Sequence, residues 1–238
     1  MTLISYLIFF SWFFLLVFLS FLISKLWSRI FPGRKFRYFV APGVIVHEFS
    51  HALACLLTGA KVTRISLFAP EGGFVEHGRS RFGFFGAALI AMAPIFGITL
   101  FLWLLAYWFG FSFDFQTIEF SSDILGNFKS LFFSAWDLVK SGAADWHFWI
   151  FVYLVISLSV SLAPSKQDFK NAFLGLLFLF AFGLAIFYWQ GSNAFLTNLI
   201  GKYLGRVVSL AVVWEIIAIV LGLPLYLLGN IIFKKSII

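Results

Sequence analysis

Apolar residues fall in long blocks along this chain of 238 residues, separated by short polar stretches. A helix needs about 20 mostly apolar residues to cross a bilayer. Six blocks meet this length. We therefore expect an all-α polytopic membrane protein, organised as one domain over residues 1–238. The six expected spans are Leu3–Trp27, Tyr38–Thr58, a segment within Phe82–Phe113, Trp146–Leu162, a segment from after Lys170 to near Gln190, and Val207–Phe233.

The connection Lys61–Arg81, which follows the second block, is predicted to form a β-hairpin. It contains two β-favouring runs, Val62–Phe68 and Phe74–Val75, on either side of a turn with Gly72 and Gly73. Such runs around a glycine turn are typical of paired antiparallel strands. We expect the hairpin at the membrane edge, with one strand free to pair.

Two other connections have the pattern of surface helices. Apolar residues recur at helical spacing over Ile124–Val139, and charged residues fall elsewhere around that helix. This pattern favours an amphipathic helix that lies in the membrane interface. Asn193–Tyr203 is a second candidate.

The composition excludes a soluble domain. Hydrophobic residues make up 62% of the chain and charged residues 11%, whereas soluble domains have about 25% charged residues. The net charge of +7 comes from Lys and Arg that lie mostly between the apolar blocks. Anionic lipid headgroups explain these cations, so we expect membrane lipids and no nucleic acid as partners. Their near-equal distribution over the two sides leaves the orientation open.

The second block contains the sequence His47-Glu48-Phe49-Ser50-His51. Residues four apart lie on one face of a helix, so both imidazoles can bind one metal ion. Glu48 follows the first imidazole and is placed to act as a general base in hydrolysis. Ionisable groups inside a span are costly, and a metal ion is a good compensating partner. The alternative is a water-filled cavity or a packing network without metal.

A catalytic zinc site usually has three protein ligands. We expect His77 and His147 to be solvated or interfacial, and Cys55 to be a small buried hydrophobic residue. Asp168 is either the third ligand or a cap of the helix that follows it. For Glu215, in the middle of the sixth block, we expect a hydrogen-bonded carboxyl group within the bundle.

The third block is rich in small residues, which allow helices to approach closely. Pro94 lies among them, and a kink there could help to shape a cavity beside the motif. The small residues are Gly83, Gly86, Ala87, Ala88, Ala91, Ala93 and Gly97.

Around the motif, PGVIVHEFSHALACLLTGAKVTRISLFAPEGGFVEHG resembles the site-2-protease family of intramembrane zinc metalloproteases. In that family an HExxH helix leads into membrane-edge strands with a Gly-Gly turn and then into another span. The resemblance implies that His47 and His51 are zinc ligands and that Glu48 is the catalytic base. It also implies Zn²⁺ as the cofactor.

The family's second motif, Asn-x-x-Pro…Asp-Gly, has a partial counterpart in this chain. Ser161 stands three residues before Pro164, where the family has Asn, and Phe169 replaces the glycine. Asp168 matches the family's aspartate but lies one residue nearer the proline than is usual. The resemblance thus implies Asp168 as the third zinc ligand.

These features together lead to the hypothesis of a zinc metalloendopeptidase that hydrolyses peptide bonds in transmembrane substrate helices. We expect it in a prokaryotic cell membrane. A locally unwound substrate would add a strand beside the hairpin. Two alternatives remain: a catalytically inactive metal-binding adaptor that tethers a membrane partner, and a small transporter with an ion or proton relay. The residues expected to contact the substrate are Ile65, Leu67, Phe68, Gly72 and Gly73.

Overall fold

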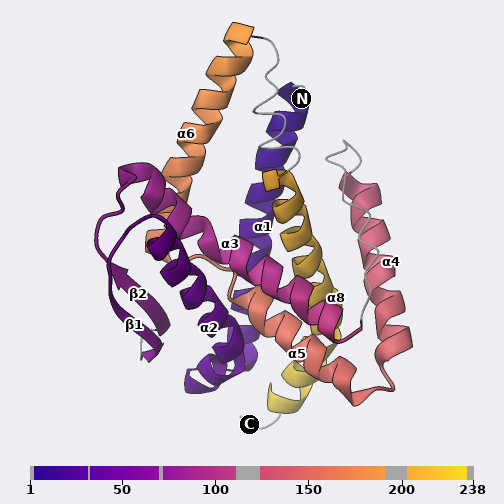
Figure 1. Cartoon of the computed structure of the whole chain (residues 1–238). Coiled ribbons are helices and arrows are strands. Elements are labelled where there is room, and N and C mark those ends of the chain that lie inside the picture. The colour runs from indigo at the N-terminus through magenta and orange to yellow at the C-terminus, as the bar shows by residue number, and fades with distance from the viewer. Residues whose placement is uncertain (1–2, 32, 70–71, 111–123, 191–202, 235–238) are drawn as a thin grey trace.

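Helices make up most of the protein, and a two-stranded sheet packs on one of them (Figure 1). The computed structural model describes residues 3–31, 33–69, 72–110, 124–190 and 203–234. The predicted fold class, a helical membrane protein with a short β-hairpin after the second helix, is confirmed. The elements are α1 (Leu3–Ile30), α2 (Arg34–Leu57), β1 (Val62–Ala69), β2 (Gly72–His77), α3 (Gly83–Trp108), α4 (Ile124–Gly142), α5 (Trp146–Val160), α6 (Lys166–Gln190) and α8 (Gly205–Lys234).

Five helices of the described chain, α1, α2, α3, α6 and α8, are long and apolar enough to cross a membrane. The fourth expected span, Trp146–Leu162, is instead the short helix α5 of 15 residues. At 1.5 Å per residue it is about 22 Å long, less than the roughly 30 Å of a bilayer core. Pro164 disfavours the helical conformation in the residue before it, which is consistent with the end of α5 at Val160.

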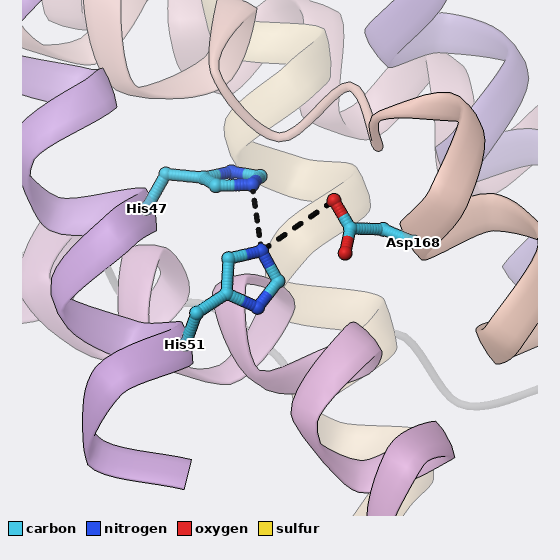
Figure 2. Close-up of side chains that lie close together, drawn as sticks. All are labelled: His47, His51 and Asp168. Carbon is cyan, nitrogen blue, oxygen red and sulfur yellow. Dashed lines mark hydrogen bonds and ion pairs between the residues drawn. The ribbon is translucent and has the colours of Figure 1, made fainter. Parts of the chain in front are cut away.

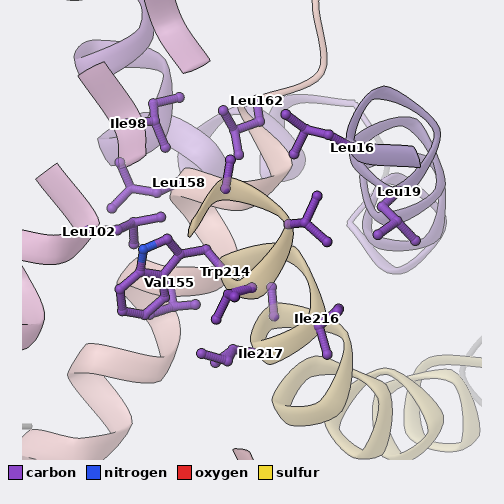
Figure 3. Close-up of a cluster of buried hydrophobic side chains, with 14 of the residues drawn as sticks. Leu16, Leu19, Ile98, Leu102, Val155, Leu158, Leu162, Trp214, Ile216 and Ile217 are labelled. Atoms are coloured by element: carbon purple, nitrogen blue, oxygen red, sulfur yellow. The ribbon is translucent and has the colours of Figure 1, made fainter. Parts of the chain in front are cut away.

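The centre of the bundle is formed by α8 and α5, with α1 and α3 around them (Figure 3). Trp214 of α8 and Val155 of α5 are fully buried, and Ile98 of α3 is equally inaccessible. Since most of α5 from Phe151 onwards is buried among other helices, the apolar sequence there reflects protein packing. This explains why its composition resembles that of a span although its length does not.

One polar pair lies within this apolar interior, between α1 and α8. Ser20 Oγ lies 2.8 Å from Glu215 Oε1 and 2.9 Å from the Leu16 carbonyl oxygen. A serine hydroxyl carries a single hydrogen. A neutral Glu215 carboxyl that donates to Ser20, while Ser20 donates to Leu16, satisfies both contacts. Glu215 is therefore a hydrogen-bonded carboxyl group within the bundle, where it ties α8 to α1.

Small residues let α2 approach its neighbours closely. A Cβ on Gly43 would overlap the carbonyl of Ser157 in α5 and the hydroxyl of Ser161, the C-cap of α5. On the α3 side, a Cβ on Gly97 would overlap Ser50 of α2. The Gly43 backbone N–H donates to Ser157 Oγ across 3.2 Å. The face of α2 that carries the motif is thus held tightly against both helices.

The hairpin runs back along α2 instead of staying at its end. β1 and β2 are antiparallel, with Val62 opposite His77 and Ile65 opposite Val75. At the other end of β2, a Cβ on Gly73 would meet Glu48, nine residues before the end of α2 at Leu57. Nine residues of helix correspond to about 14 Å. The hairpin therefore reaches about 14 Å back along α2 from the C-terminal end of that helix.

The helix predicted at Ile124–Val139 exists as α4, Ile124–Gly142. It packs along α8 (Figure 1), so it runs beside a candidate span rather than alone on a surface. The second surface helix, predicted at Asn193–Tyr203, lies almost wholly outside the described residues.

Candidate metal centre

Three side chains from two helices converge at one point in the bundle (Figure 2). His47 Nε2 and His51 Nε2 of α2 are 3.1 Å apart, and Asp168 Oδ2 of α6 lies 3.5 Å from His51 Nε2. The three candidate ligand atoms lie within 4.8 Å of one another. The structure thus brings together the two histidines of the motif and the aspartate of the second, partial motif.

Both imidazoles are oriented through their other nitrogen. His47 Nδ1 lies 2.6 Å from the Ser161 carbonyl oxygen, and His51 Nδ1 lies 2.8 Å from the Ile90 carbonyl oxygen. A carbonyl only accepts, so each Nδ1 carries a hydrogen, and each imidazole in its neutral form keeps a lone pair on Nε2. The two lone pairs then face each other across 3.1 Å. A cation between them removes this repulsion.

The two orienting carbonyls are available because helical hydrogen bonding is interrupted at both. In α3, Pro94 stands four residues after Ile90 and has no N–H to donate to the Ile90 carbonyl. α5 ends at Val160 with Ser161 as its C-cap, where backbone carbonyls lack intrahelical donors. Each imidazole takes the place of a missing backbone donor.

Asp168 both caps its own helix and reaches the histidines. The Asp168 backbone N–H donates to Ser165 Oγ across 3.1 Å, and the Ser165 N–H donates to Asp168 Oδ2 across 3.3 Å. This reciprocal pair is a capping box at the start of α6. The cap holds the carboxylate beside His51, so capping and metal ligation are compatible roles.

Two of the three separations are close to those around a tetrahedral metal ion. Zinc binds imidazole nitrogen and carboxylate oxygen at about 2.0–2.2 Å, so two tetrahedral ligand atoms stand about 3.3–3.6 Å apart. The 3.5 Å between His51 and Asp168 lies in this range, the 3.1 Å between the imidazoles is slightly shorter, and all three atoms lie within 4.8 Å of one another. Two nitrogens and one oxygen would also leave one position open. The residues present therefore fit a metal ion with a free coordination site.

Glu48 is buried and faces the hairpin. A Cβ on Gly73 would come within 2.8 Å of Glu48 Oε1, so only glycine allows β2 to lie this close. His47 and Glu48 are consecutive in α2 and point about 100° apart around it. The Glu48 carboxylate therefore lies against β2, on the part of α2 next to the face that carries His47.

The remaining sequence candidates lie away from this cluster. His77 on β2 is exposed and donates to the Gly78 carbonyl. His147 is exposed and lies 2.8 Å from Asp145, and its backbone N–H and imidazole hold the pKa of Asp145 below its ordinary value. Cys55 is fully buried in a small apolar cluster.

The residues predicted to contact a substrate all lie on the hairpin. Gly72 and Gly73 begin β2, while Ile65, Leu67 and Phe68 belong to β1. The Ile65 side chain is 51% exposed. Among the five, Gly73 is the one whose backbone lies against Glu48.

Reasoning from the sequence missed the Ile90 and Ser161 carbonyls as groups that orient the histidines. Backbone groups carry no residue-type signal, but the prolines that follow them do. Pro94 stands four residues after Ile90, and Pro164 stands three after Ser161. A proline four residues on removes the helical donor to a carbonyl, so Pro94 marks the carbonyl of Ile90, while Pro164 marks only the end of α5 near Ser161.

A family model described as Peptidase M50B-like matches residues 12–116. This range contains the HExxH motif, the hairpin and α3, and it ends before Asp168. The resemblance to the site-2-protease family is thereby confirmed over somewhat less than half of the chain. No curated protein and no solved structure matches the chain. The prokaryotic origin stays a prediction.

We expect Pro94→Ala to lower the affinity for Zn²⁺ by about 10- to 100-fold, the usual cost of losing a partner that orients a ligand. The new N–H at position 94 would compete with His51 for the Ile90 carbonyl. Pro224→Ala is the matched control, since Pro224 lies inside α8. Competition with a chelator of known affinity measures both variants. Equal affinities would contradict the role of the Ile90 carbonyl.

The two roles of Asp168 are separable by mutation. Ser165→Ala removes the cap and should cost about 0.5–2 kcal/mol of stability, with at most a 10- to 100-fold loss of Zn²⁺ affinity. Asp168→Ala should lower the affinity by more than that. Thermal unfolding and chelator competition in detergent provide the two readouts. If Asp168→Ala binds Zn²⁺ as tightly as Ser165→Ala, Asp168 is only a cap.

Proposed function

We propose that this protein is an intramembrane zinc metalloendopeptidase that cleaves transmembrane substrate helices. One observation carries the proposal: the Nε2 lone pairs of His47 and His51 converge with the Asp168 carboxylate inside an apolar bundle, beside Glu48. The Peptidase M50B-like match over residues 12–116 supports a metallopeptidase.

The proposed chemistry divides among the four side chains. His47, His51 and Asp168 would hold the ion. When bound, zinc polarises a carbonyl and makes water acidic enough to attack near neutral pH. Glu48 accepts the proton of the attacking water and passes it to the leaving amine, the usual role of a general base in such sites. The carbonyls of Ser161 and Ile90 keep the two imidazoles fixed throughout.

The hairpin offers a place for an unwound substrate. A helix satisfies its own backbone groups, so a substrate must find new hydrogen-bond partners when it unwinds within the membrane. A two-stranded sheet leaves one edge of each strand unpaired, and an extended peptide can add to such an edge. Because Gly73 lies against Glu48, a strand added here would pass close to the catalytic groups.

The two alternative functions differ in their observable behaviour. A metal-binding adaptor would hold zinc without cleaving any transmembrane peptide. A transporter would lose ion flux in proteoliposomes when His51 is replaced, with or without zinc. The convergence of two imidazole nitrogens and one carboxylate oxygen within 4.8 Å favours a metal centre over a proton relay.

Glu48→Gln should retain zinc at the wild-type stoichiometry and lose peptide cleavage by about 10²- to 10⁴-fold, the usual contribution of a general base. Elemental analysis gives the zinc content. Mass spectrometry follows the cleavage of apolar transmembrane peptides in micelles. Glu76→Gln, on the exposed part of β2, is the matched control and should cleave normally. A wild-type protein that never contains zinc would refute the proposal.

Gly73→Ala should impair cleavage while leaving bound zinc unchanged, because the added Cβ would meet Val44 and Glu48. The strand has to move away from the carboxylate, so we expect at least a tenfold lower rate, about 1.4 kcal/mol in the barrier. Gly78→Ala is the control, since a Cβ there has open space apart from one atom at 3.8 Å. Equal rates for both variants would show that the close approach of β2 is dispensable.

A further inference from the structure

A cavity of about 30 Å³ lies beside His47. Val17 and Ser20 of α1, Ala91 and Pro94 of α3, and Ala172 of α6 contribute to its walls. Leu162, in the connection between α5 and α6, closes one side. His47 thus contributes to the metal centre through its Nε2 and to this cavity through its ring.

The walls of the cavity are almost entirely carbon. His47 and Ser20 are the polar side chains among the described residues that line it. The Ser20 hydroxyl is engaged with Glu215 and the Leu16 carbonyl. His47 Nδ1 is engaged with Ser161. Neither group is left to hydrogen-bond a polar ligand, so the cavity suits an apolar group.

His47 belongs both to the metal centre and to the wall of this cavity. On α2, Glu48 faces Gly73 of β2, and His47 faces the cavity. In an extended peptide, successive side chains point to opposite sides. A peptide whose carbonyl is held at the metal centre would therefore place one of the two side chains beside the scissile bond near His47, next to the cavity.

We propose that this cavity is a specificity subsite for a small aliphatic side chain, such as that of alanine or valine, next to the scissile bond. The proposal rests on the proposed peptidase function. A single water needs roughly 10–15 Å³ on the same scale, so the cavity has room for a few methyl groups and not for an aromatic ring. Continuity with His47, a residue of the metal centre, favours the substrate over a lipid acyl chain as the occupant.

Direct binding tests the subsite without requiring turnover. The probes are peptidyl hydroxamates that differ only in the side chain next to the zinc-binding group: hydrogen, methyl, isopropyl or benzyl. For the zinc-loaded full chain we expect isopropyl or methyl to bind about 10- to 200-fold more tightly than benzyl, the range that apolar pockets achieve for such differences. Equal affinities for all four would overturn the subsite.

Variants at Ala172 assign the preference to this cavity. Ala172→Leu fills the space and should weaken isopropyl binding at least tenfold relative to hydrogen, while Ala172→Gly should improve the binding of larger side chains. Ala181→Leu, at an exposed position of the same helix, should change neither. Zinc content checks that each variant is intact. Should Ala172→Leu destabilise the protein, Ala172→Gly alone decides: an unchanged preference overturns the proposal.

Cleavage of a peptide library by the wild type separates the subsite from the proposed function. If the hydroxamates show the expected preference and no peptide is cut, the subsite stands as a ligand-binding pocket and the peptidase function fails. If peptides are cut with no preference for small aliphatic residues beside the bond, the peptidase stands and the subsite is wrong.

Discussion

The central constraint of this structure is the contact between two imidazoles within an apolar bundle. Their Nε2 lone pairs face each other across 3.1 Å, and a carboxylate lies 3.5 Å from one of them. Inside a membrane such groups are tolerated where another group compensates them. The tautomers exclude a proton shared from either Nδ1, since both of those hydrogens are committed to carbonyls. A bound cation is the simplest compensation, and the donor set of two nitrogens and one oxygen suits zinc.

Much of the surrounding architecture can be understood as support for that centre. Interruptions in α3 and α5 release the carbonyls that orient the histidines, and the capping box of α6 holds Asp168. Small residues serve the same end, because Gly43 lets α5 approach α2 and Gly73 lets the hairpin approach Glu48. These features are unfavourable for isolated helices or strands, since proline removes a helical hydrogen bond and glycine adds backbone freedom. They occur here where two elements must meet at close range.

How much of this could be predicted from the sequence depends on how local each feature is. The long apolar blocks identified the helices, and the spacing of His47 and His51 placed both imidazoles on one face, since both signals lie within a single element. The helix predicted at Trp146–Leu162 exists but is shorter than a typical span, and the sequence could not show this because burial among helices and exposure to lipid favour the same residues. The meeting of Asp168 with His51 depends on how the connection between α5 and α6 returns to α2, which no local pattern encodes. Likewise, the carbonyl of Ile90 has no residue-type signal, although Pro94 indirectly marks it.

Anomalous diffraction at the zinc absorption edge, from crystals of the wild-type protein, tests the central claim most directly. We expect a single peak in the bundle, about 2 Å from His47 Nε2, from His51 Nε2 and from one Asp168 carboxylate oxygen. A peak bound by the two histidines but not by Asp168 would contradict the proposed ligand set. No peak in a protein purified with zinc present would contradict the metal centre itself.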